Sequence, residues 1–138
     1  MPHPNRALII AEPWIDLILE GRKTWEMRPS STGFRGWIAL SRKGSAMISG
    51  VARLTDCLSP LTRHRMLDTT ALHGVPADAI RSGLASSWRT PWVLADVTPL
   101  RQAVPFRPGL GAVVWASLGP EEIDAVAAQL PQGELLAV

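Results

Sequence analysis

The chain has 138 residues, of which 46% are hydrophobic and 19% charged, and its formal net charge is +2. This length and composition predict one globular domain, residues 1–138, and exclude a disordered chain. The single cysteine, Cys57, excludes an internal disulfide and a cysteine-based zinc site, and the three histidines do not have the spacing of metal ligands. We therefore expect neither a metal nor a cofactor.

The charges are unevenly distributed along the chain. Residues 1–65 contain ten Lys and Arg against five Asp and Glu, whereas residues 66–138 contain four against seven. A basic first half can attract a polyanion, although an ordinary solvated surface explains the same counts. The apolar runs are too short to cross a membrane and the N-terminus lacks a signal-peptide pattern, so we expect a cytoplasmic protein.

In chain order, the sequence predicts six strands and three or four short helices. The strands are expected at residues 6–10, 23–28, 36–41, 46–57, 90–100 and 111–118. The helices are expected at residues 12–21, in two short pieces within 58–90 (the second starting near Pro76), and at about 120–130. Because most strands follow one another without a crossover helix, the pattern favours an α+β fold. We expect a small, mostly antiparallel β-barrel with flanking short helices and a C-terminal helix.

Capping residues indicate where the helices begin and end. Pro13 suits the first position of the first helix, where its missing N–H costs nothing, and Gly21 suits the C-terminal cap. Pro120 opens the last helix in the same way. Gly50 marks a bulge in the fourth strand.

The last predicted helix has an apolar stripe along one side. The stripe consists of Ile123, Val126, Ala127 and Leu130. It either packs on the protein's own barrel or docks on a partner such as a second copy of the chain, which would be a homodimer. The apolar residues of the tail, Leu135, Leu136 and Val138, could also dock on a core or on a partner.

The stretch "GRKTWEMRP", residues 21–29, contains the densest group of polar side chains. Strand alternation places three of them on one face, with neighbours roughly 6.5–7 Å apart: Thr24, Glu26 and Arg28. The opposite face has Lys23, Trp25 and Met27, where Trp25 is expected in the core. The helix before this strand brings Trp14 back towards it, which predicts a pocket with an aromatic wall, two cations, a carboxylate and a hydroxyl. A structural ion pair beside a solvated strand end explains the same pattern.

The stretch "EPWIDLILEGRKTWEMR" resembles the signature of the ASCH domain family, which belongs to the PUA-like superfamily of small β-barrels. The family pattern is a Pro-Trp helix start followed by Gly-x-Lys-x-x-Glu-x-Arg, and Gly21, Lys23, Glu26 and Arg28 match its spacing. The stretches "FRGWIALS", "GVARLTDC" and "WVLADVTPLRQAVPFRPGLGAVVW" resemble the later blocks of the family in the same order. The resemblance covers about residues 6–118, and the C-terminal helix is an addition.

The resemblance implies a barrel with a cleft beside the first helix, and a module that binds single-stranded RNA or a modified nucleotide there. An aromatic ring would stack on a base, the cations would contact phosphate or a base edge, and the carboxylate would orient the arginine or accept from an exocyclic amine. The residues expected to bind the ligand are Trp14, Lys23, Glu26, Arg28, Arg42 and Lys43.

A hydrolase is the alternative, because some family members deacetylate N4-acetylcytidine and others have ribonuclease activity. In that case Lys23, Thr24 and Glu26 are the expected catalytic residues. Lys23 matches the family's lysine, but Glu26 stands where the nucleophilic threonine is expected, and Thr24 lies two residues earlier. For a downstream acid the candidates are Asp68 and Asp78. Whether the chain is an enzyme stays open at this point.

Overall fold

The structure is a computed structural model and describes residues 3–131. Its six strands are β1 (Arg6–Ile10), β2 (Trp25–Arg28), β3 (Gly36–Arg42), β4 (Met47–Cys57), β5 (Thr90–Pro105) and β6 (Trp115–Ser117). Its five helices are α1 (Trp14–Leu19), α2 (Arg63–Asp68), α3 (Thr70–His73), α4 (Ala77–Arg81) and α5 (Pro120–Ala127). Among the described residues, no helix is long and apolar enough to span a membrane.

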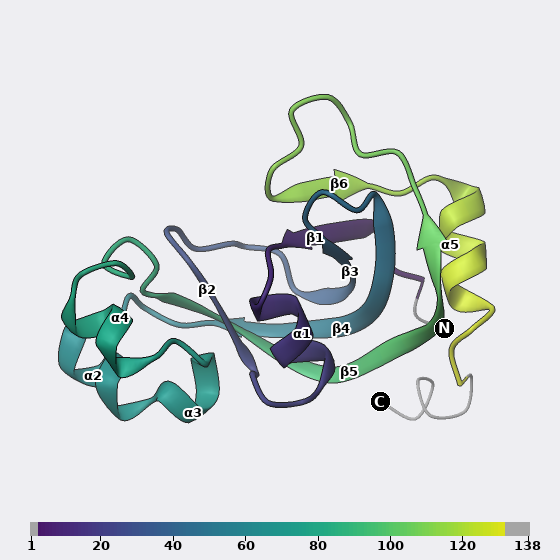
Figure 1. The fold of residues 1–138 in the computed structure, drawn as a ribbon. Coiled ribbons are helices and arrows are strands. Elements are labelled where there is room, and N and C mark those ends of the chain that lie inside the picture. The colour runs from purple at the N-terminus through teal and green to yellow at the C-terminus, as the bar shows by residue number, and fades with distance from the viewer. Residues whose placement is uncertain (1–2, 132–138) are drawn as a thin grey trace.

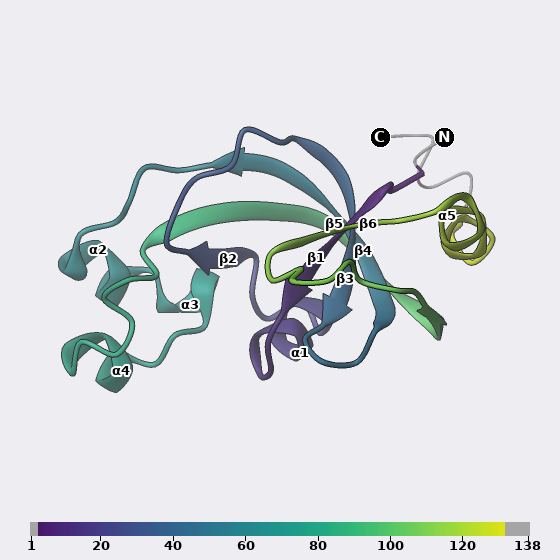
Figure 2. The same cartoon turned by 90° about the horizontal axis from the view of Figure 1, so that it is seen from above.

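All six strands form one sheet in the order β2-β5-β4-β3-β1-β6. Only the β1–β3 pair is parallel, and the other neighbouring pairs are antiparallel. Strands β4 and β5 are long and strongly curved, so the sheet curls into a half-barrel (Figures 1 and 2). Helices α2, α3 and α4 gather at one end of the molecule and α5 lies at the opposite end. The predicted α+β class and mostly antiparallel sheet are confirmed.

Strand β1 runs through the centre of the core and is buried on both faces. Ala7 and Ile9 belong to the hydrophobic cluster that includes Val126 of α5. Leu8 and Ile10 belong to the cluster on the other face, which includes the apolar residues of α1. A strand covered on both faces needs an apolar residue at every position, and this explains the run "ALII".

Helix α5 packs its predicted stripe against the chain's own sheet. Val126, Ala127 and Leu130 are at most 5% exposed, and two of them belong to the cluster beneath the sheet. Of the two alternatives for this stripe, it therefore packs on the protein's own sheet. The helix begins at Pro120 as predicted but ends at Ala127, because the next residues turn towards β5. There the Gln129 side chain accepts from the backbone N–H of Gln102 at 3.0 Å and donates to its carbonyl at 2.7 Å. The tail, including Leu135, Leu136 and Val138, lies outside the described residues.

Several predicted boundaries were wrong. The strand expected at 111–118 is only three residues long, Trp115–Ser117, because a loop with a left-handed glycine, Gly111, precedes it. Strand β5 continues to Pro105 instead of ending at 100. The middle region contains three short helices instead of two, since Gly74 in the left-handed conformation ends an additional helix, α3.

The predicted bulge at Gly50 is confirmed by a register shift between Ile48 and Gly50 relative to β5. A Cβ atom at Gly50 would lie 2.6 Å from Cδ2 of Leu19 and 3.1 Å from the carbonyl oxygen of Thr98. Glycine at this position lets α1 lie directly on β4, which positions the residues that follow α1 in the chain.

Candidate functional site

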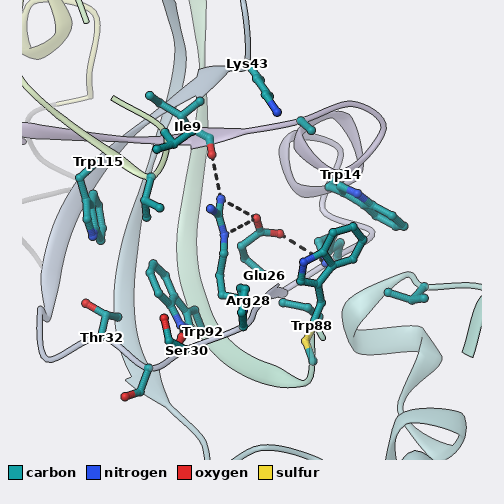
Figure 3. A pocket seen from close by; sticks show the side chains of 18 residues that line it. Ile9, Trp14, Glu26, Arg28, Ser30, Thr32, Lys43, Trp88, Trp92 and Trp115 are labelled. Atoms are coloured by element: carbon teal, nitrogen blue, oxygen red, sulfur yellow. Dashed lines mark hydrogen bonds and ion pairs between the residues drawn. The ribbon is translucent and has the colours of Figure 1, made fainter. Parts of the chain in front are cut away.

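The two ends of the curled sheet meet at a cavity. Arg28 on β2, at one end of the strand order, donates from Nη2 to the carbonyl of Ile9 on β1, near the other end, at 2.8 Å. Trp92 on β5 and Trp115 on β6 stack with their ring centroids 5.8 Å apart and their planes at 19°. At this junction lies a cavity of about 560 Å³, which is within the usual range for small-ligand sites (Figure 3). We call it the junction cavity.

The lining of the junction cavity is aromatic and charged. Its tryptophans are Trp14, Trp88, Trp92 and Trp115, and its charged residues are Lys23, Glu26, Arg28 and Lys43. The segment 29–32 adds serine and threonine, and residues 113–114 add two valines. Rings beside charged groups can hold a ligand that has both a flat face and polar edges.

A carboxylate between two cations lies at the centre of the cavity. Glu26 Oε2 accepts from Arg28 Nε at 3.0 Å and lies 2.8 Å from Arg28 Nη2. Glu26 Oε1 lies 3.7 Å from Lys23 Nζ. The side chains of Lys23, Glu26 and Arg28 are 1%, 6% and 14% exposed, so water screens these interactions little. With both cations protonated the three groups carry a net charge of +1.

Lys23 lies beneath this ion pair and its ammonium has acceptors on several sides. Nζ donates to the carbonyls of Trp25 at 2.6 Å and His73 at 2.5 Å. Burial lowers the pKa of Lys23 to about 8, an effect that nearby Arg28 strengthens and Glu26 opposes. At neutral pH the ammonium is thus still protonated, but its pKa lies close to neutrality.

His73 provides one of these carbonyls and is itself fixed by hydrogen bonds. Its Nδ1 accepts from the backbone N–H of Val75 at 2.9 Å, so Nε2 carries the hydrogen and donates to the carbonyl of Met66 at 2.8 Å. Burial lowers the pKa of His73, which favours this neutral form. His73 therefore holds its own carbonyl in place under Lys23.

Arg28 is the member of the group that a ligand can reach. Its Nε and Nη2 contact Glu26 and Ile9, whereas Nη1 has no hydrogen-bond partner within residues 3–131. The guanidinium carbon lies 5.6 Å from the ring centroid of Trp92. One edge of a preoriented guanidinium can therefore donate to a ligand in the cavity.

Two other residues expected at the site also line the cavity. Trp14, at the start of α1, is half-buried, with its ring centroid 5.3 Å from Lys23 Nζ. Lys43, in the turn after β3, is exposed at the rim. Figure 3 shows Lys43 and Ile9 on the side of the cavity towards which Arg28 points.

The expected face of Lys23 was wrong, since Lys23 precedes β2 and its side chain turns towards Glu26. The backbone N–H groups of Arg22 and Lys23 both donate to the carbonyl of Leu17, so the chain at Lys23 still folds back against the C-terminal end of α1. Trp25, expected in the core, is half-buried against the hydrophobic cluster formed with α2 and α4, and it does not line the cavity.

Thr24 and Arg42 do not line the junction cavity. Thr24 is exposed, and its backbone N–H donates to the carbonyl of Leu72. The guanidinium of Arg42 forms ion pairs with Asp16 at 2.6 Å and with Glu12 at 3.0 Å. This pairing lowers the pKa of Asp16.

The two candidate acids also lie away from the cavity. Asp68 is 53% exposed and pairs with His64, and Asp78 is fully exposed near Arg81. Within the described part of the chain, no group of three potential metal-ligating residues comes together.

Sequence reasoning missed three of the four tryptophans in the lining. Trp92 and Trp115 were recognised only as strand residues, and Trp88, 47% exposed, lies in the loop before β5. The available signal was composition, because the chain has six tryptophans and no tyrosine. No local pattern distinguishes a tryptophan of the core from one that lines a cavity.

Comparisons with known proteins agree on one fold. The family model described as ASCH domain matches residues 8–102. The crystal structure of ASCH from Zymomonas mobilis matches with a TM-score of 0.67 and 15% identity, covering 92% of this chain and 96% of that chain. Crystal structures of two mutants of ZmASCH match with TM-scores of 0.66 and 0.65 and identities of 14% and 15%, covering 89% and 93% of this chain and 96% and 98% of theirs. A search of curated proteins gives no match.

Proposed function

Because the chain belongs to the ASCH domain family, we propose that it binds single-stranded RNA or a modified nucleotide in the junction cavity. The ASCH domain is an RNA-binding type of PUA-like fold. The observation that carries the proposal is the guanidinium of Arg28. It is held on one side by Glu26 and leaves one edge for a ligand, inside a cavity walled by tryptophans.

The walls and the charged centre supply different parts of the binding. A base stacked on Trp88 or Trp14 would gain roughly 1–3 kcal/mol. The free edge of Arg28 would donate to a base acceptor or to a phosphate, and Glu26 could accept from an exocyclic amine. A ligand that combines a flat face with such polar edges is a nucleotide.

Lys23 supports this site from below. At 1% exposure, and with two carbonyls and a carboxylate around its ammonium, it orients Glu26 instead of contacting the ligand directly. Glu26 in turn orients Arg28. Loss of Lys23 would therefore weaken binding through the position of the other two side chains.

A hydrolase is the second candidate, and the lowered pKa of Lys23 favours it. An amine with a pKa of about 8 has a neutral fraction at mildly alkaline pH and could take a proton from an attacking group. Lys23 and Glu26 would then be the catalytic residues. Thr24 is left out of this proposal because it does not line the cavity.

Calorimetric titration of the purified protein with short single-stranded RNAs and nucleosides tests the proposal. Trp88→Ala should weaken binding by about 5- to 150-fold, the equivalent of 1–3 kcal/mol, without unfolding the chain, because Trp88 is half-exposed. Arg28→Ala should weaken binding as well. Arg101→Ala is the control, since Arg101 is exposed and does not line the cavity. Unchanged affinity in both cavity variants would refute the site.

The same mixtures are analysed by chromatography for RNA fragments and for deacetylation of N4-acetylcytidine. Product formation that both Lys23→Met and Glu26→Gln abolish would support the hydrolase. Saturable binding without any product would support a binding module.

A further inference from the structure

A second cavity adjoins the junction cavity. Its volume is about 370 Å³, and it shares Ile9, Lys43 and Val113 with the junction cavity. Its other lining residues come from the end of β3, the turn after it and the loop before β6. We call it the rim cavity, because it shares the exposed Lys43 at the rim of the first cavity.

The rim cavity differs chemically from the junction cavity. Its lining contains two cations, Arg42 and Lys43, but no aromatic ring and no carboxylate. Arg42 is engaged by two acids outside the lining, whereas Lys43 forms no ion pair with any residue in 3–131. Ser41, which is 2% exposed, also lines the cavity.

These features fit a phosphate and a sugar better than a base. An unpaired ammonium attracts a phosphodiester, and a serine hydroxyl in the lining can bond to a phosphate or ribose oxygen. No ring is available on which a base could stack. The volume, about 370 Å³, is within the range of ligand sites.

Resting on the proposed function, we propose that the ligand is a polynucleotide, held through at least two consecutive nucleotides. One base occupies the junction cavity, and the adjoining phosphate and sugar continue past Lys43 into the rim cavity. The substrate class is then a single-stranded RNA segment, and a free nucleoside would fill only half of the site.

Calorimetry with four probe sets tests this proposal: nucleosides, their 3′-monophosphates, their 5′-monophosphates, and dinucleoside monophosphates of the common bases. The best dinucleoside monophosphate should bind at least about tenfold more tightly than its nucleosides. Its affinity should also fall with salt, with a logarithmic slope of about 0.7 for the one phosphate contacted.

Three variants test whether the rim cavity causes the tighter binding of the dinucleoside monophosphate. Lys43→Ala should remove the salt slope, whereas Arg101→Ala, an equal loss of charge at an exposed residue outside both cavities, should keep it. Pro108→Glu puts a carboxylate in a residue that lines only the rim cavity, and should bring the ratio of dinucleotide to nucleoside affinity towards one. Thermal melts of each variant check that the chain is folded.

The possible outcomes distinguish failure of the two-nucleotide proposal from failure of the proposed function. Equal affinity for nucleosides and dinucleoside monophosphates, with both weakened by Trp88→Ala, would overturn the two-nucleotide ligand and leave the junction cavity as a nucleoside site. Equal salt slopes in Lys43→Ala and Arg101→Ala would also overturn it. No binding of any probe or of longer RNA would overturn both proposals.

Discussion

The stability of this protein should rise with alkaline pH, because the ammonium of Lys23 is buried. Its pKa is about 8 in the folded chain, below the ordinary value of 10.5 that applies when the chain is unfolded. Below pH 8 both states hold the proton, so Lys23 gives no pH dependence. Between pH 8 and 10.5 the folded state releases the proton while the unfolded state keeps it, so the free energy of unfolding rises.

The size of the effect follows from the separation of the two pKa values. At 1.36 kcal/mol for each pH unit, the gain across this window is about 3 kcal/mol. The 1% exposure of Lys23 means that solvent screening reduces this figure little.

Urea unfolding followed by tryptophan fluorescence, between about pH 7 and pH 10, measures the effect. Lys23→Met is the comparison, since it removes the titrating group and keeps the length of an apolar side chain. The free energy of unfolding of the natural chain should rise relative to that of Lys23→Met as the pH increases. A constant difference between the two proteins would mean that Lys23 titrates as an exposed lysine does, and the reasoning from its burial would be wrong.

Three further predictions follow from the same geometry. Glu26→Gln leaves two cations without their shared carboxylate, so urea unfolding at neutral pH should show a loss of about 3–5 kcal/mol. Gly50→Ala places a Cβ atom 2.6 Å from Leu19 Cδ2 and 3.1 Å from the Thr98 carbonyl, so the thermal midpoint should fall, with a cost of about 1–3 kcal/mol. An unchanged midpoint would mean that α1 shifts freely. Thr24→Ala should leave RNA affinity within about twofold, less than 0.5 kcal/mol, because Thr24 is exposed outside the cavity. A large loss of affinity in Thr24→Ala would mean that the Thr24 hydroxyl takes part in binding.

The part of the site that the sequence predicts is the part fixed by strand alternation. Glu26 and Arg28 are two residues apart on β2, so they share a face whatever the rest of the fold does. Their contact at 2.8 Å needs no long-range information. The α+β class and the mostly antiparallel sheet were likewise predictable, since strand-length apolar runs follow one another without crossover helices.

The orientation of Lys23 was not predictable in this way. Alternation assumes an extended backbone, but the backbone N–H of Lys23 still donates to the carbonyl of Leu17 at the end of α1. Its ammonium is then held by the carbonyl of His73, fifty residues later in the chain. The contact with His73 has no local pattern that would reveal it.

The aromatic walls depend on the curl of the whole sheet. Trp92 and Trp115 lie on strands that are far apart in the strand order, and only the curvature of β4 and β5 brings their rings together. Strand curvature is set by bulges and left-handed residues such as Asp96, whose φ is 53°. The sequence marks few of these positions, so the wall that Trp92 and Trp115 form could not be derived from it.

The bond from Lys23 to His73 limits how far the protein can be shortened. Helices α2–α4 follow β4 and precede β5 in the chain, gather at one end of the molecule, and look like a module that deletion could remove (Figure 1). Such inserted segments often tolerate changes in length when their backbone groups are exposed. Here the insertion supplies a buried acceptor for the cation beneath the ligand site. A minimal version of the domain would therefore have to keep α3, or replace its carbonyl, to preserve the geometry of the cavity.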